Sequence, residues 1–319
     1  MVQLILTSNG IITESIPVMH RIRGMMFSLA WDGKVRANGK GLVGGRFYLD
    51  YPSVGATATL MMAACMAEGK TLLSNVAQEP EIIELAHFLT ESGACINDAG
   101  SDKIYICGKN QLHGSEYGTM PDRIETGTFI LAAAITRSCF SLSPVFPCSL
   151  SGLLEKLQLS AIPASRGDDL RGFNFRTQPY PGFPTDLQPQ TMALLSTCSG
   201  SSIIEESVFE NHMGHVRELQ KFGAKIEVCG STALVFGKEK GSHFSGSRVT
   251  ATDLRGGTSL VLAGLASEGI TEINGISHID RGYENLESKL CLIGADIKRQ
   301  DLNKGHANNF ITPVCTSTT

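Results

Sequence analysis

The sequence predicts an α/β protein made of repeated units in which helices alternate with short strands. Two observations predict this class. The same order of parts, a helix of small apolar residues, a β-branched strand and an amphipathic helix, returns along the chain at a spacing of roughly 70 residues. The length of 319 residues, with 42% hydrophobic and 18% charged residues, is that of an ordinary globular protein of about two domains.

The first clear unit lies between residues 53 and 96. Small apolar residues predict a helix that runs through residues 60–67, the run 71–75 predicts a strand, and Pro80 opens a second helix. Another strand is expected after the Gly-Ala turn at Gly93. The apolar residues of the second helix recur at the i, i+3 and i+4 spacing of one helix face: Ile82, Leu85, Phe88 and Leu89.

Three further units repeat this order, in residues 125–157 as a degenerate copy, in 184–226 and in 253–297. Helices so rich in alanine and glycine are stable only when neighbours cover most of their sides, so we expect them in the core. Strands predicted at residues 103–107 and 233–236 lie between the units. The sequence therefore favours sheets that flank buried helices.

Composition excludes several function classes. The chain has 27 Lys and Arg against 31 Asp and Glu, and the basic residues form no run, so we expect no nucleic-acid binding. The most apolar run, residues 60–67, is far shorter than the roughly 20 residues that cross a bilayer, so we expect no membrane span. Nine cysteines without a C-x-x-C pair favour a reducing compartment, with neither disulfides nor a zinc site.

Two motifs are rejected as cofactor or metal sites. Residues 39–44 satisfy G-x-G-x-x-G, but the strand-like run 47–49 follows where a dinucleotide site needs a helix. Glu84 and His87 have the i, i+3 spacing of a di-metal helix, but only one such copy is present. We therefore expect a turn and a strand at the first motif, an ordinary helix surface at the second, and no metal.

Three segments at the starts of repeat units remain as candidate sites, because helix N-termini favour anions. Segment 52–57 combines Ser53 and Gly55 at a helix start, which suits a diphosphate; a simple N-cap by Ser53 is the alternative. In segment 183–186, Asp186 follows a rigid turn, where it could cap the next helix or act as a base.

The third segment combines two arginines with glycine turns. Arg255 is followed some 25 residues later by Arg281, and guanidinium groups bind phosphate and carboxylate groups with two parallel hydrogen bonds. The alternative is a surface ion pair for each arginine, Asp253 with Arg255 and Asp280 with Arg281.

Six motifs follow one another in a fixed order across about residues 34–300. They are Tyr-Pro-Ser-Val-Gly-Ala-Thr at 51–57, Glu-Pro-Glu-Ile at 79–82, Pro-Asp-Arg-Ile-Glu-Thr-Gly-Thr at 121–128, Pro-Gly-Phe-Pro-Thr-Asp at 181–186, Ala-Thr-Asp-Leu-Arg at 251–255, and His-Ile-Asp-Arg-Gly-Tyr at 278–283. In these motifs the chain resembles the UDP-N-acetylglucosamine enolpyruvyl transferases, also called UDP-N-acetylglucosamine 1-carboxyvinyltransferases.

The resemblance implies repeated βαβ-type units in two domains, the inside-out α/β barrel of the enolpyruvyl transferases, with the active site between the domains. We expect residues 34–120 to form an incomplete first domain and residues 121–300 to form the second. Residues 1–33 match no unit, and residues 301–319 are expected to be a solvated tail.

The resemblance also implies an activity and a set of site residues. Family members transfer the enolpyruvyl group of phosphoenolpyruvate to the 3′-hydroxyl of UDP-N-acetylglucosamine and release phosphate, in the first committed step of peptidoglycan synthesis. By this resemblance Asp186 is the base at the sugar hydroxyl, while Arg255 and the catalytic Arg281 bind phosphoenolpyruvate. The residues that hold the nucleotide sugar would be Ser53, Val54, Gly55, Val208 and Phe209. No metal or organic cofactor is implied, and we expect a monomer in the bacterial cytoplasm or the plastid stroma.

Some parts of the family's pattern are not recognisable here. Ahead of the matched part, the family has a Lys-Asn pair, a further arginine and a mobile loop with a proton donor, and His212 stands where the family usually has arginine. We therefore expect the chain by itself to be weakly active or inactive. The alternatives are a non-catalytic remnant that binds UDP-N-acetylglucosamine or a partner, and the sibling enzyme that transfers enolpyruvyl to shikimate phosphate.

Overall fold

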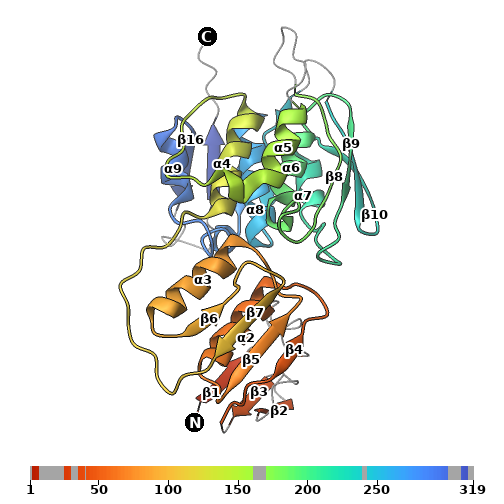
Figure 1. Ribbon diagram of the computed structural model, residues 1–319. Coiled ribbons are helices and arrows are strands. Elements are labelled where there is room, and N and C mark those ends of the chain that lie inside the picture. The colour runs from red at the N-terminus through yellow and green to blue at the C-terminus, as the bar shows by residue number, and fades with distance from the viewer. Residues whose placement is uncertain are drawn as a thin grey trace. The chain divides into compact units, whose positions relative to one another are not determined.

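The computed structural model describes residues 41–160, 170–238 and 243–300 in full, together with the backbone of four strands outside these ranges. The four strands are β1 (Val2–Leu6), β2 (Met25–Leu29), β3 (Val35–Gly39) and β17 (Phe310–Val314). The chain divides into two compact units, Met1–Met120 and Pro121–Thr319 (Figure 1). Helices and strands are labelled as in Figure 1.

In its described residues, the first unit contains two sheets and two helices. β1, β3 and β2 form an antiparallel sheet in that order. The second sheet has the order β4-β5-β7-β6, in which β4 and β5 are parallel and the other neighbours are antiparallel. The elements around this sheet are β4 (Arg46–Tyr48), α2 (Val54–Cys65), β5 (Lys70–Ser74), α3 (Pro80–Glu91), β6 (Cys95–Asn97) and β7 (Lys103–Cys107).

α2 and α3 share one apolar core with the second sheet of this unit (Figure 1). Burial alternates along β5 and β7, so that Leu73, Ile104 and Ile106 turn into this core and the residues between them face outward. Ser53 is the N-cap of α2, and Pro80 is the first residue of α3, where its missing N–H costs nothing.

The part of the second unit that the structure describes has three sheets around a group of helices. The sheets have the orders β8-β9-β11-β10, β13-β15-β17-β16 and β12-β14. The helices are α4 (Arg123–Thr136), α5 (Ser151–Ser160), α6 (Gln188–Leu195), α7 (Val216–Lys221), α8 (Leu254–Leu265) and α9 (Leu286–Leu292), with 3₁₀ turns η1 (Pro147–Leu150), η2 (Thr185–Leu187) and η3 (Ile276–His278). The strands are β8 (Phe175–Arg176), β9 (Ser201–Glu205), β10 (Lys225–Cys229), β11 (Thr232–Phe236), β12 (Phe244–Ser245), β13 (Arg248–Thr250), β14 (Ser267–Glu268), β15 (Glu272–Asn274) and β16 (Asp296–Gln300).

α4, α6 and α8 pack against one another in the middle of the second unit. All eight residues of α6 and the ten consecutive residues 256–265 of α8 are buried. Such a helix needs small residues: a Cβ added to Gly257 would lie only 2.8 Å from both the Ala251 Cβ and the Ile279 side chain. The expectation that the small-residue helices form the core is confirmed in this unit.

The predicted α/β class of repeated units is confirmed. The strands expected at 103–107 and 233–236 correspond to β7 and β11, and the small-residue helices of the first and last units correspond to α2 and α8. The rejected G-x-G-x-x-G segment starts at the last residue of β3, and the next element after it is the strand β4 and not a helix.

The prediction of a solvated tail after residue 300 is wrong for residues 310–314. These residues form β17, which lies between β15 and β16 and pairs antiparallel with both. The open edges of β15 and β16 each present unpaired backbone groups, and a strand inserted between them supplies hydrogen-bond partners for both edges. Residues 301–309 and 315–319 lie outside the described residues, as does most of the unmatched segment 1–33.

Candidate active site

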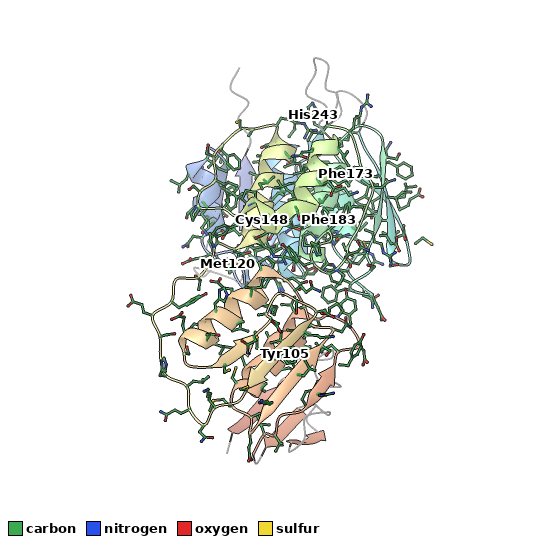
Figure 2. All side chains as sticks on the ribbon, viewed as in Figure 1. Tyr105, Met120, Cys148, Phe173, Phe183 and His243 are labelled. Atoms are coloured by element: carbon green, nitrogen blue, oxygen red, sulfur yellow. The ribbon has the colours of Figure 1, made fainter. Side chains whose placement is uncertain are left out.

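The turn that holds Asp186 is anchored by an aromatic side chain. Phe183 is buried and lies against Phe175 of β8, with ring centroids 4.1 Å apart, on the inner side of the second unit (Figure 2). The Gln178 N–H donates to the Phe183 carbonyl at 2.9 Å, which ties down the chain just before Pro184. Asp186 therefore has a fixed position in the short 3₁₀ turn η2, which directly precedes α6.

Asp186 pairs with Arg255 and does not cap the helix that follows it. No side chain caps the N-terminus of α6. Instead, the Arg255 Nε donates to Asp186 Oδ1 at 3.0 Å, although the two residues are 69 positions apart. The Asp186 side chain is 44% exposed and that of Arg255 is 17% exposed, so the carboxylate is open to a solute and the guanidinium is mostly enclosed.

Arg255 is held in the first turn of α8. The alternative pairing of Arg255 with Asp253 is wrong, because Asp253 is the N-cap of α8 and accepts from the Gly256 N–H at 2.7 Å. The Arg255 Nη1 donates to the Tyr283 hydroxyl at 3.1 Å, and the guanidinium carbon lies 5.5 Å from the Tyr283 ring centroid. Burial alone would lower the pKa of Arg255, but Asp186 and Tyr283 outweigh burial and raise this pKa above its ordinary value.

The Tyr283 hydroxyl joins three helices to this ion pair. Tyr283 is 1% exposed, and its hydroxyl lies 2.9 Å from the Thr128 Oγ1 of α4 and 3.2 Å from the Gln190 Nε2 of α6. The role of these residues was not predicted. Polar residues among the small and apolar residues of the repeat helices, such as Gln190 and Thr128, are the sequence signal that could have indicated a buried polar network.

Val208 and Phe209 lie in the turn after β9. Their backbone N–H groups donate to Glu206 Oε1 at 2.9 Å and 3.2 Å. The Phe209 side chain is exposed and lies edge-on to the imidazole of His212, with centroids 5.5 Å apart. Glu206 was also missed by sequence reasoning, although two consecutive acids at the end of a predicted strand would place one of them on the inner face.

Arg281 is not brought into contact with Asp186 or Arg255. It is exposed in the turn after η3, and no hydrogen bond or ion pair joins it to another residue in the described ranges. The alternative pairing with Asp280 is wrong, because Asp280 pairs with Arg299 of β16. Arg281 is therefore a free cation within the part of the chain that the structure describes.

Ser53, Val54 and Gly55 lie at the start of α2 in the first unit. The Ser53 Oγ accepts from the Ala56 N–H at 3.3 Å, as the N-cap interpretation predicts. Gly55 is exposed, and a Cβ added to it would meet no atom within 4 Å, so the backbone here is open to a solute. The assignment of a diphosphate to these residues stays a prediction.

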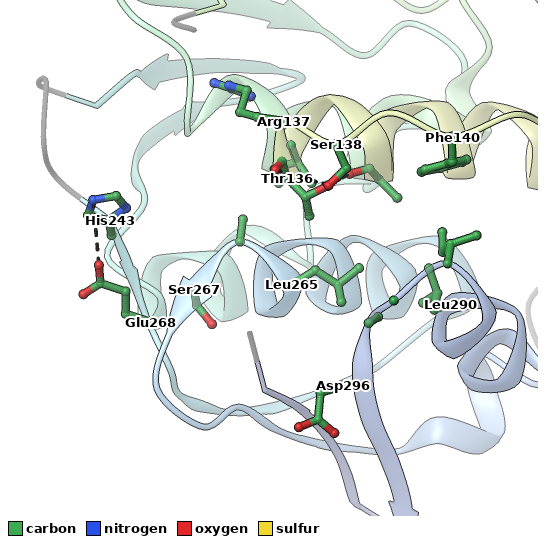
Figure 3. Close-up of a pocket in the computed structure, with 16 residues that line it drawn as sticks. Thr136, Arg137, Ser138, Phe140, His243, Leu265, Ser267, Glu268, Leu290 and Asp296 are labelled. Carbon is green, nitrogen blue, oxygen red and sulfur yellow. Dashed lines mark hydrogen bonds and ion pairs between the residues drawn. The ribbon is translucent and has the colours of Figure 1, made fainter. Parts of the chain in front are cut away.

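The described residues show neither a metal site nor a membrane span, and they contain a second pocket. Among them, no group of three His, Cys, Asp or Glu side chains is placed to hold a metal ion, and none of the helices is long and apolar enough to cross a membrane. A separate pocket of about 590 Å³ lies at the C-terminal ends of α4 and α8, where Thr136, Ser138, Glu268 and Asp296 contribute polar groups (Figure 3). It contains none of the predicted site residues.

The fold and the site together define the class of protein. The structure of this chain is similar to the crystal structure of the enolpyruvyl transferase NikO from Streptomyces tendae, with a TM-score of 0.79 and 25% identity over 93% of this chain and 74% of that chain. EPSP synthase from Acinetobacter baumannii, at 18% identity and a TM-score of 0.62, shares the fold over 90% of this chain and 71% of that chain. The model of the EPSP synthase (3-phosphoshikimate 1-carboxyvinyltransferase) family matches residues 31–290, and the chain belongs to this family.

Relatives that are similar in sequence carry a more specific name within this family. The chain is 50% identical, over 84% of its length, to UDP-N-acetylglucosamine 1-carboxyvinyltransferase from Gloeobacter violaceus, and covers 60% of that protein. It is 45% identical, over 89% of its length, to the protein of the same name from Prochlorococcus marinus, and covers 68% of it. The chain thus spans about two thirds of the length of these curated relatives.

Proposed function

We propose that this chain contributes to enolpyruvyl transfer from phosphoenolpyruvate to the 3′-hydroxyl of UDP-N-acetylglucosamine. The observation on which the proposal rests is the Asp186–Arg255 pair, in which a half-exposed carboxylate is held at 3.0 Å by an enclosed guanidinium. The names of the relatives at 45% to 50% identity support the nucleotide sugar as acceptor. Nine cysteines without paired spacing suit a reducing compartment, such as the bacterial cytoplasm or the plastid stroma.

The chemistry suits these side chains. The acceptor oxygen forms a bond to C2 of phosphoenolpyruvate while a proton is added at C3; removal of a C3 proton then expels phosphate. A base must take the proton of the attacking hydroxyl, and Asp186 has an exposed oxygen for this, because only Oδ1 is engaged by Arg255. Arg255 fixes the direction of the carboxylate and places a permanent positive charge beside the developing charges.

The proposal also gives substrate-binding roles to the other predicted site residues. The open backbone at Gly55 and the Ser53 hydroxyl suit the diphosphate, and Val208 with the exposed Phe209 would lie along the nucleotide sugar. Arg281 is a free cation in the described part of the chain, as expected of a residue that awaits a substrate carboxylate or phosphate.

The proposal is tested with UDP-N-acetylglucosamine and phosphoenolpyruvate together. We expect calorimetric titration to show binding of UDP-N-acetylglucosamine, and any phosphate release that the chain supports to fall to background in Asp186→Ala, because removal of a catalytic acid or base lowers a rate by about a hundredfold or more. Glu227→Ala, which removes an exposed carboxylate from β10, is the matched control and should leave both measurements unchanged.

The other outcomes separate the alternatives. Binding of UDP-N-acetylglucosamine with no phosphate release above the Asp186→Ala background would indicate a nucleotide-sugar-binding protein without turnover. Absence of binding to UDP-N-acetylglucosamine, together with phosphate release when shikimate 3-phosphate is supplied, would assign the chain to the sibling reaction and contradict the proposal.

A further inference from the structure

A buried carboxylate lies between the parts of the proposed site in the second unit. Glu206 follows the last residue of β9, and its side chain is 0% exposed. Burial alone would raise the pKa of this carboxyl. The hydrogen bonds that it accepts, first among them the one from His212, outweigh burial and lower this pKa to about 2. Glu206 is therefore an anion that is enclosed by donors.

The two oxygens of Glu206 hold two different loops. Oε1 accepts from the Val208 and Phe209 N–H groups, at 2.9 Å and 3.2 Å, and from the Thr177 hydroxyl at 2.7 Å. It therefore shapes the turn after β9 and ties this turn to the segment after β8.

Oε2 holds the other loop. It accepts from the Thr185 hydroxyl at 2.9 Å and lies 3.3 Å from the His212 Nδ1. Thr185 and His212 are themselves 3.1 Å apart, so the three groups form a closed triangle. Thr185 precedes Asp186 in η2, and the Oε2 contacts therefore fix the chain immediately before the proposed base.

We propose that Glu206 is a positioning residue, which sets the distance between the loop of Asp186 and the turn of Val208 and Phe209. The inference rests on the proposed function, because those residues are the proposed base and the proposed contacts of the nucleotide sugar. Glu206 itself is enclosed and touches no solute, so it acts through the groups that it holds.

A carboxylate is needed because both oxygens must accept. An amide has one acceptor oxygen, and its nitrogen can only donate. Glu206→Gln can therefore keep an oxygen in place of Oε1, with its three accepted hydrogen bonds. It then puts an amide nitrogen, which cannot accept, in place of Oε2, with nearly the same side-chain volume. Thr185 allows the same comparison on the other side of the bond: Thr185→Val removes the hydroxyl with little change of shape, and Thr185→Ser keeps the hydroxyl.

The first experiment needs no ligand. Amide proton shifts of Val208 and Phe209 are measured by NMR in ¹⁵N-labelled protein, together with the melting temperature. Glu206→Gln is compared with Glu205→Gln, which changes a neighbouring carboxylate that is 45% exposed and pairs with Arg176. We expect the two amide resonances to move upfield in Glu206→Gln, because their hydrogen bonds then go to a neutral amide oxygen in place of a charged carboxylate, and to stay in place in Glu205→Gln.

The second experiment measures affinity for UDP-N-acetylglucosamine by calorimetry. We expect Glu206→Gln and Thr185→Val each to weaken binding by about tenfold to a hundredfold, the range for loss of a hydrogen bond to a charged group, and Thr185→Ser to recover most of it. Equal affinities for Thr185→Val and Thr185→Ser, or unchanged amide shifts in Glu206→Gln, would overturn the positioning role.

The failure of the proposed function gives a different result. If the unsubstituted protein does not bind UDP-N-acetylglucosamine at all, the proposed function is wrong, and the amide shifts alone then decide whether Glu206 holds the Val208–Phe209 turn: displacement supports that role, and unchanged shifts overturn it.

Discussion

Tyr283→Phe tests whether the Tyr283 hydroxyl network stabilises the second unit. The substitution keeps the ring and removes the hydroxyl, which lies 3.1 Å from Arg255 Nη1, 2.9 Å from Thr128 Oγ1 and 3.2 Å from Gln190 Nε2. Because the side chain is 1% exposed, water has little access to replace the missing oxygen.

The magnitude follows from which partners are left unsatisfied. Thr128 keeps its bond to the Ile124 carbonyl at 2.8 Å, and Gln190 keeps its contact with Thr128 Oγ1 at 3.3 Å. The bond that the charged Arg255 donates to the hydroxyl is lost, which costs about 1.5 to 3 kcal/mol, and loss of the two neutral contacts adds a few tenths of a kcal/mol each. We expect the second unit to lose about 2 to 3 kcal/mol of stability.

Hydrogen–deuterium exchange measured by mass spectrometry reports the stability of the second unit separately from that of the first. The most protected amides of α4, α6 and α8 should exchange about 30- to 150-fold faster in Tyr283→Phe, since each 1.4 kcal/mol changes an equilibrium tenfold. Tyr105→Phe is the control, because Tyr105 lies on the exposed face of β7 in the first unit. A change below about threefold in Tyr283→Phe would refute the reasoning that the hydroxyl network is stabilising.

Two further predictions concern stability. Burial lowers the pKa of His215 to about 3, so only the unfolded chain takes up a proton at this residue as the pH falls below about 6.5. The free energy of unfolding is therefore highest above that pH and should fall by about 2 kcal/mol between pH 7.5 and 5.0. His215→Gln should make the urea midpoint measured by circular dichroism less dependent on pH over this range, and an unchanged dependence would contradict the assignment. Gly275→Ala should destabilise more than Gly230→Ala in the same assay: both glycines have positive φ, which costs an alanine about 1 kcal/mol, but only at Gly275 would the new Cβ meet a backbone oxygen, that of Ala251. Equal losses in the two variants would show that the Ala251 carbonyl yields at little cost.

Local patterns predicted much of the fold. The helices of small residues were expected in the core because such helices are stable only when neighbouring elements cover most of their sides. The complete burial of α6 agrees with this. Ser53 and Pro80 mark helix starts through bonds or constraints within a few residues of themselves, which a sequence shows directly. β17 was missed, because a short segment after a polar stretch becomes a strand only when two open edges are available to it.

The sequence by itself determined which residue types start the repeat units, and hence which acids and arginines were candidates for a site. Only the tertiary structure decided their partners. Both alternatives that paired an arginine with its neighbouring acid are wrong: Asp253 caps α8, Asp280 pairs with Arg299, and Arg255 reaches Asp186 instead. The physical reason is that carboxylates are interchangeable in sequence, whereas an ion pair forms with the one that packing brings within about 3 Å of the guanidinium.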